Sequence, residues 1–113
     1  MNYNVSTKEM NLTIDKNKLK MAPLAVGREL GYAFFRDPKS GEESFVRRPY
    51  GSFYPRFHLY IETRGNQAVF NLHLDQKQAS YPGAHKHNAD YDGDAVATEM
   101  ERIKKVILTI SSN

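Results

Sequence analysis

The chain has 113 residues, no cysteine and a formal net charge of +3 at pH 7. This length predicts one domain, residues 1–113, with a core of its own, and the absence of cysteine excludes disulfides and thiolate zinc sites. No apolar run approaches the about 20 residues of a membrane span, and the polar first residues do not resemble a signal peptide. We therefore expect a cytoplasmic protein without a membrane partner.

Positive charge is concentrated in the first half of the chain. Residues 1–57 carry ten Lys and Arg against six Asp and Glu, whereas residues 58–113 carry six against seven. A basic half of this kind can face a polyanion. An ordinary solvated surface explains the same charge, so both interpretations stay open.

The first elements in chain order are a weak strand and a helix. Residues 11–14 alternate like a strand, and we expect part of residues 1–14 to be loosely ordered. Asp15 can cap a helix, which Gly31 would end. Four apolar residues between them repeat at helical spacing: Leu19, Ala22, Val26 and Leu30. Pro23 either kinks this helix or begins a second one.

Two hairpins follow. Residues 32–36 and 44–48 are strand-like and are separated by turn residues at 37–42, which predicts a hairpin over about 32–48. Residues 55–63 and 68–75 alternate strictly, and Gly65-Asn66 suits a two-residue turn between them. This turn pairs Arg64 with Gln67 and so sets the register of a second hairpin over about 55–75.

That register separates the two faces of the second hairpin. One face is apolar, with Phe57 opposite Leu74, Leu59 opposite Leu72 and Ile61 opposite Phe70. The other face is polar, with Arg56 opposite Asp75, His58 opposite His73 and Tyr60 opposite Asn71. A slip of one residue would mix the faces, so burial itself favours this pairing.

A C-terminal helix over about 94–111 completes the predicted fold. Its apolar stripe is Val96, Met100, Ile103, Ile107 and Ile110. Its predicted outer face is Glu99, Glu101, Arg102, Lys104 and Lys105. We predict an α+β fold in which a small antiparallel sheet packs against this helix and the N-terminal helix. The polar face of the second hairpin would then point to solvent or to the long connection at residues 76–92.

The opposed histidines predict a divalent-metal site. Directly opposed residues of an antiparallel pair have Cβ atoms about 4.5–5.5 Å apart, so His58 and His73 can share one ion. Asp75 lies on the same face, and His85 and His87 in the connection can complete the ligand sphere. Imidazole and carboxylate ligands suit Zn²⁺ or Mn²⁺. The alternative is an ordinary polar surface in which Arg56 and Asp75 form a cross-strand ion pair.

A metal at this place would support hydrolysis of phosphoester-type substrates. The ion would lower the pKa of a bound water and polarise the scissile group. Arg56 and Lys77 would hold the small anionic substrate, and Asp90 would accept a proton or bind the metal.

Residues 88–99 also match the spacing of a calcium-binding loop. Oxygen-bearing side chains stand at its positions 1, 3 and 5, with Gly93 and Glu99 at positions 6 and 12. The sequence before this segment does not predict the entering helix of such a motif. The alternative is that Asp92 and Asp94 stabilise the start of the C-terminal helix.

Residues 45–57 interleave arginines with aromatic residues. In single-stranded nucleic-acid binding, rings stack on bases and guanidinium groups meet phosphates. The candidate residues are Arg47, Arg48, Tyr50, Phe53 and Tyr54. The alternatives are core aromatics flanked by edge charges that deter aggregation, and a protein-interaction domain without catalysis.

Three segments resemble a group of small uncharacterised prokaryotic proteins. They are residues 55–61 (PRFHLYI), 71–77 (NLHLDQK) and 81–87 (YPGAHKH) continuing to residues 91–93. The resemblance covers about residues 55–107, and it implies no activity, cofactor or partner.

Overall fold

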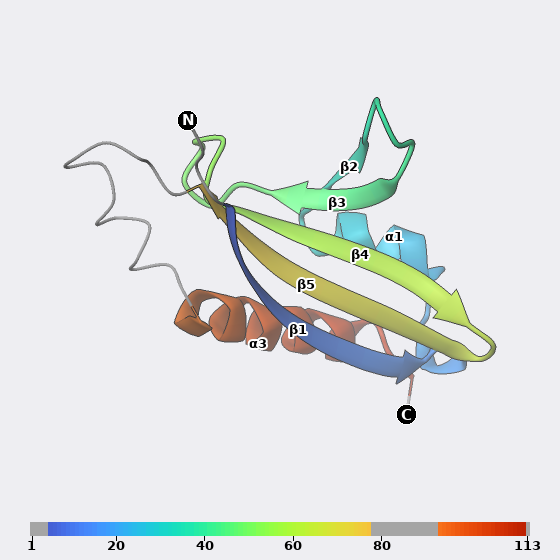
Figure 1. Ribbon diagram of the computed structural model, residues 1–113. Coiled ribbons are helices and arrows are strands. Elements are labelled where there is room, and N and C mark those ends of the chain that lie inside the picture. The colour runs from blue at the N-terminus through green and yellow to red at the C-terminus, as the bar shows by residue number, and fades with distance from the viewer. Residues whose placement is uncertain (1–4, 78–92, 113) are drawn as a thin grey trace, which may run out of the picture.

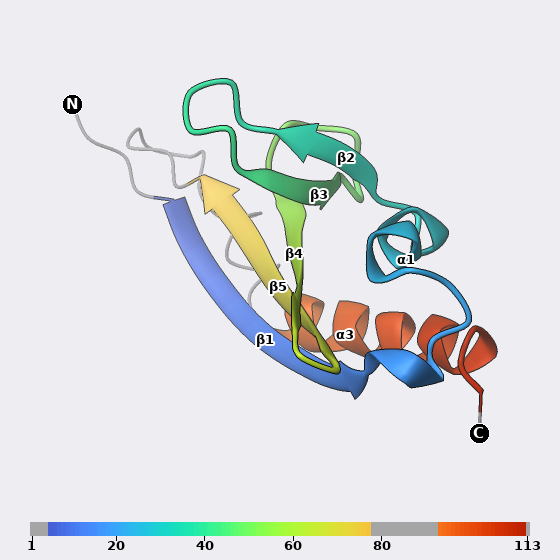
Figure 2. The same cartoon turned by 90° about the vertical axis from the view of Figure 1, so that its right-hand side faces the viewer.

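The computed structural model describes residues 5–77 and 93–112, and these form a five-stranded antiparallel sheet in the order β1-β5-β4-β3-β2. The strands are β1 (Val5–Asp15), β2 (Ala33–Arg36), β3 (Glu43–Arg47), β4 (Arg56–Arg64) and β5 (Gln67–Lys77). The helices α1 (Pro23–Glu29) and α3 (Gly93–Thr109) lie on the same face of this sheet (Figures 1 and 2). The predicted α+β fold is confirmed. No helix in the described part of the chain is long and apolar enough to cross a membrane.

The β4–β5 hairpin has the predicted register throughout. Arg64 pairs with Gln67, His58 with His73 and Arg56 with Asp75. Gly65 begins the turn with a φ of +60°, a conformation that favours glycine. On the inner face Leu59, Leu72 and Phe70 are fully buried. The alternation of apolar residues therefore set both the pairing and the direction of the core.

The N-terminal segment forms a longer strand than residues 11–14 predict. β1 pairs antiparallel with β5 from Val5 opposite Lys77 to Asp15 opposite Gln67. This pairing makes β1 an edge strand and extends the sheet beyond the hairpin (Figure 1). Residues 5–14 are part of this strand because β5 supplies a hydrogen-bonding partner that their sequence does not reveal, and residues 1–4 lie outside the described residues.

The prediction of one continuous helix from Asp15 to Leu30 is wrong. Asp15 caps only a short 3-10 turn, η1 (Lys16–Lys18), by accepting a hydrogen bond from the backbone N–H of Asn17. The chain is extended at Ala22, and α1 begins at Pro23. Proline has no N–H to donate and its ring disfavours a preceding helical turn, so it suits the first position of a helix. Of the two interpretations of Pro23, the second is confirmed.

The C-terminal helix α3 packs its apolar stripe onto the sheet, as predicted. The five stripe residues are buried: Val96, Met100, Ile103, Ile107 and Ile110. They share one core with residues of α1 and with the inner faces of β3, β4 and β5. The opposite face of the sheet carries the polar side chains of β4 and β5.

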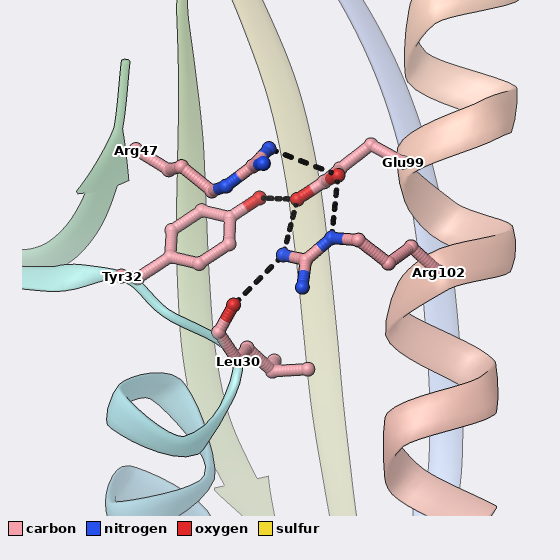
Figure 3. A network of polar contacts seen from close by, with 5 residues as sticks. All are labelled: Leu30, Tyr32, Arg47, Glu99 and Arg102. Carbon is pink, nitrogen blue, oxygen red and sulfur yellow. Dashed lines mark hydrogen bonds and ion pairs between the residues drawn. The ribbon is translucent and has the colours of Figure 1, made fainter. Parts of the chain in front are cut away.

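Glu99 departs from the predicted outer face of α3 and is only 4% exposed. Its Oε2 accepts hydrogen bonds from the Tyr32 hydroxyl at 2.6 Å and from Arg102 Nη2 at 2.8 Å (Figure 3). Its Oε1 accepts from Arg102 Nε at 2.9 Å and from Arg47 Nη1 at 3.2 Å. Residue 99 lies at the border of the apolar stripe, and a carboxylate can be buried there because it is paired and hydrogen-bonded.

This network joins three parts of the fold. Arg102 also donates to the carbonyl oxygen of Leu30 at 2.8 Å, so it bridges α3 to the end of α1. Burial, together with the charge and hydrogen bond of Glu99, raises the pKa of the Tyr32 hydroxyl far above its usual value. The hydrogen bonds that Arg102 donates to Glu99 likewise raise the pKa of Arg102. The Tyr32 hydroxyl therefore keeps its proton and donates a hydrogen bond to Glu99.

Replacing Glu99 by glutamine should destabilise the protein strongly. Glu99→Gln leaves Arg47 and Arg102 without their buried counter-charge, and because solvent screens these half-exposed guanidinium groups the loss should be about 1–3 kcal/mol. Glu101→Gln is the matched control, since Glu101 is exposed and pairs with Lys104 on the surface. It should change the free energy of unfolding by less than about 0.5 kcal/mol. Urea denaturation of both variants tests this, and equal effects would contradict the role of Glu99.

Candidate functional site

The polar face of the sheet, opposite α1 and α3, gathers side chains from neighbouring strands. Arg56, His58 and Tyr60 alternate along β4 with the buried residues of the inner face. Asp75 and His73 of β5 lie directly opposite Arg56 and His58. No helix of the described chain covers these side chains. We refer to this surface as the open face.

His58 is the most connected residue of the open face. Its Nδ1 lies 3.0 Å from Asp75 Oδ2, and its Nε2 lies 2.9 Å from Ser44 Oγ. The His58 side chain is 12% exposed, and Ser44 is 3% exposed. Both ring nitrogens are thus engaged, which fixes the orientation of the imidazole.

Asp75 is held by two cationic or polar groups. Arg56 Nε donates to the same Oδ2 atom at 3.3 Å, which gives the cross-strand ion pair considered from the sequence. Burial opposes the charged form of Asp75, but the hydrogen bonds and charges of His58 and Arg56 outweigh it and hold the pKa of this carboxyl below its usual value. Asp75 is consequently a carboxylate at neutral pH.

His73 lies beside this pair but has weaker contacts. Its Nε2 is 3.9 Å from Glu9 Oε2 of β1. The Tyr60 ring stands between the histidines, stacked on His58 at a centroid distance of 5.0 Å and edge-on to His73 at 5.4 Å. Burial and nearby carboxylates raise the pKa of Tyr60. The centre of the open face is therefore a row of three rings that crosses two strands.

An arginine and aromatic cluster adjoins the start of β4. The guanidinium of Arg48 lies 4.8 Å from the centre of the Phe53 ring, and that of Arg56 lies 5.0 Å from Phe53 and 5.2 Å from Tyr54. The two rings meet edge to face at 4.9 Å. Phe53 is 59% exposed. We call these four residues the arginine–aromatic cluster.

The other two candidate nucleic-acid residues lie elsewhere. Arg47 points to the helix side, where it binds Glu99. Arg47 and Tyr50 line a hollow of about 430 Å³ between the start of α3 and the sheet, together with Phe57 and Thr98. Arg47 binds Glu99 on the helix side whereas Arg48 lies over the Phe53 ring, so the consecutive basic residues at 47 and 48 do not form one patch.

The structure brings together only part of the predicted metal site. His58, His73 and Asp75 share the open face, whereas His85, His87, Asp90 and the side chain of Lys77 lie outside the described residues. Within the described ranges, no three histidine, aspartate or glutamate side chains are placed to hold a metal ion. For the calcium-loop interpretation, residues 88–92 are likewise outside the description, and Glu99 is engaged by Tyr32, Arg47 and Arg102.

Ser44 was not a candidate from the sequence. It reaches His58 because β3 pairs with β4 so that Val46 lies opposite His58, and Ser44, two residues before Val46, lies on the same face. The connection between these strands is not a tight turn, so the sequence contains no signal for their register.

Comparison with known proteins adds no assignment, because no family model, curated protein or solved structure matches the chain. The function has to be argued from the geometry of the open face.

Asp75→Asn should destabilise the protein at neutral pH but not in acid. A carboxyl whose pKa is lowered by folding contributes stability above its unfolded pKa of about 3.9, and this stability is lost as the pH falls through the lower folded value. The variant should lose about 1–3 kcal/mol at pH 7, where His58 and Arg56 lose a charged partner.

The test is urea denaturation of wild type and Asp75→Asn between pH 7 and pH 2.5. The difference should shrink below about pH 4. Glu62→Gln, at an exposed position on the same strand, is the control and should show no such convergence. A difference that is independent of pH would show that the Asp75 charge contributes no stability.

Proposed function

We propose that the protein is a cytoplasmic module that binds single-stranded nucleic acid on its open face. The arginine–aromatic cluster carries this proposal. In it, Arg48 and Arg56 lie against the exposed ring of Phe53. Bases stack on exposed aromatic rings, and guanidinium groups pair with the phosphates between them. Such a cluster offers both contacts at adjoining positions.

The open face continues the row of rings beyond the cluster. His58 and Tyr60 follow Arg56 along β4, and Phe35 of β2 lies edge-on to His58 with centroids 6.4 Å apart. Phe35 is 37% exposed. A sheet surface with rings on neighbouring strands is a stacking platform that tolerates any base sequence. The expected ligand is therefore a short single strand, bound without strong sequence preference.

The distribution of charge favours binding of an anionic ligand on the part of the open face near β2, β3 and the start of β4. Arg48 is exposed and has no ion-pair partner among the described residues. On the opposite edge strand, Glu9 of β1 adds negative charge. A polyanion is attracted to the first region and repelled by the second. The strand should accordingly run over the arginine–aromatic cluster and past Phe35 rather than across β1.

Binding should depend on salt and on two particular residues. With phosphate contacts from Arg48 and Arg56 and a slope of about −0.7 per contact, affinity for a single strand falls roughly sevenfold between 50 and 200 mM salt. Arg48→Ala should weaken binding and reduce that slope by about 0.7. Phe53→Leu removes the stacking ring while keeping apolar volume, and should cost about 1–3 kcal/mol of binding free energy.

Fluorescence anisotropy with labelled 12-nucleotide oligo-dT and oligo-rU measures these effects. Arg28→Ala is the charge-matched control, since Arg28 is an exposed residue of α1 on the helix side. It should leave affinity within twofold. Undetectable binding at 50 mM salt, or equal losses for Arg28→Ala and Arg48→Ala, would reject the proposal.

A metal-dependent hydrolase of phosphoester-type substrates is the second candidate. It is favoured by the direct opposition of His58 and His73, with Asp75 on the same face. Zn²⁺ or Mn²⁺ at this position would displace the hydrogen bond of one His58 nitrogen. His85, His87 and Asp90 would supply further ligands, and Arg56 and Lys77 would bind the anionic substrate.

Histidine NMR resonances of the untagged protein distinguish this candidate. His58 and His73 should shift or broaden together at one equivalent of Zn²⁺ or Mn²⁺, because they would bind the same ion. The double variant His58→Ala plus His73→Ala should abolish metal affinity. Four histidines that titrate independently with pH and ignore both ions would remove this candidate.

A further inference from the structure

Ser44, His58 and Asp75 form a hydrogen-bonded chain in the order of a hydrolytic triad. Ser44 Oγ is 2.9 Å from His58 Nε2, and Asp75 Oδ2 is 3.0 Å from His58 Nδ1. A serine on one imidazole nitrogen and a carboxylate on the other is the arrangement in which histidine acts as general base toward the serine. We propose that these two hydrogen bonds make Ser44 a nucleophile toward small activated esters. This activity would be independent of nucleic-acid binding.

Three neighbouring strands hold the three groups. Ser44 lies on β3, His58 on β4 and Asp75 on β5, and backbone ladders join these strands in sequence. A group on a sheet is positioned more rigidly than one on a loop. Arg56 Nε donates to the same Asp75 oxygen at 3.3 Å and helps to fix the carboxylate. Asp75 therefore orients His58 and does not need to move.

The reaction needs no co-reactant other than the ester and water. Ser44 Oγ forms a bond to the ester carbonyl carbon while its proton moves to His58 Nε2. The tetrahedral intermediate then breaks the bond to the leaving alcohol, which takes the proton from Nε2 and leaves an acyl-serine. Water attacks this acyl group in the second half, His58 again carries the proton to the serine oxygen, and a carboxylic acid is released.

Phe35 controls access to the serine. Phe35 of the edge strand β2 is the cross-strand partner of Ser44, and its ring lies edge-on to that of His58. Ser44 is 3% exposed, whereas Phe35 is 37% exposed. A substrate has to enter beside a ring that is itself at the surface. Because Ser44 is nearly buried beside this ring, we expect small acyl groups to react best, and acetyl esters with a good leaving group are the substrate class of the proposal.

The first test uses an alkyl fluorophosphonate on the wild-type protein. This probe forms a bond between phosphorus and an activated serine oxygen and releases fluoride. Peptide mass spectrometry should locate the adduct on Ser44. Ser52, an exposed residue of the loop before β4, is an internal control and should remain unlabelled. This measurement does not require any variant to fold.

The second test follows p-nitrophenyl acetate hydrolysis and the acetylated peptide. Ser44→Ala and His58→Ala should each lower the rate at least roughly 100-fold, the contribution expected of a general base. His73→Ala is the matched control, because His73 lies opposite His58 without contacting Ser44. Phe35→Ala should raise the rate by opening access. Asp75→Asn should also lower it at pH 7, in samples that circular dichroism shows to be folded.

Three results would overturn the proposal. They are no probe adduct on Ser44, hydrolysis that Ser44→Ala leaves unchanged, and acetylation confined to lysine or histidine side chains. Any of them would show that the hydrogen bonds among Ser44, His58 and Asp75 serve only the structure of the sheet. None of these experiments depends on Arg48 or Phe53, so nucleic-acid binding and ester hydrolysis can fail separately.

Discussion

The register of the β4–β5 hairpin is the constraint on which the other features depend. Because side chains alternate across a strand, one register gives an apolar face and a polar face, and any single-residue slip destroys both. The apolar face provides the layer onto which α3 and α1 pack. The polar face places His58 opposite His73 and Arg56 opposite Asp75. Core formation and the arrangement of the open face are thus two results of the same pairing.

Buried and half-buried charges appear on both sides of this sheet, with different consequences. Glu99 is enclosed between α3 and the sheet and is paired by Arg47 and Arg102. All of these contacts lie within the protein, so Glu99 helps to hold α3 against the sheet. Asp75 is 14% exposed at the side chain and faces His58 and Arg56 on the open face. Its partners border solvent, which is why the chemical proposals concern this side of the molecule.

The two activities proposed for the open face rest mainly on different groups. Nucleic-acid binding rests on the arginine–aromatic cluster before β4, where cations and exposed rings adjoin. Ester hydrolysis rests on the chain from Ser44 through His58 to Asp75. His58 lies between the two, stacked on Tyr60 and edge-on to Phe35. A ligand over Phe35 would cover the route to Ser44, so the two ligands should compete if both activities exist.

The amino-acid sequence by itself determined the β4–β5 register, the first hairpin and the buried stripe of α3. These elements are local, since a tight turn sets pairing and the 2- and 3.6-residue periods identify the buried face. Tertiary structure decided the partner of β1, the burial of Glu99 and the approach of Ser44 to His58. Each of these three features depends on contacts between segments that no tight turn connects. Their geometry follows from how the strands and helices assemble, which local periodicity does not encode.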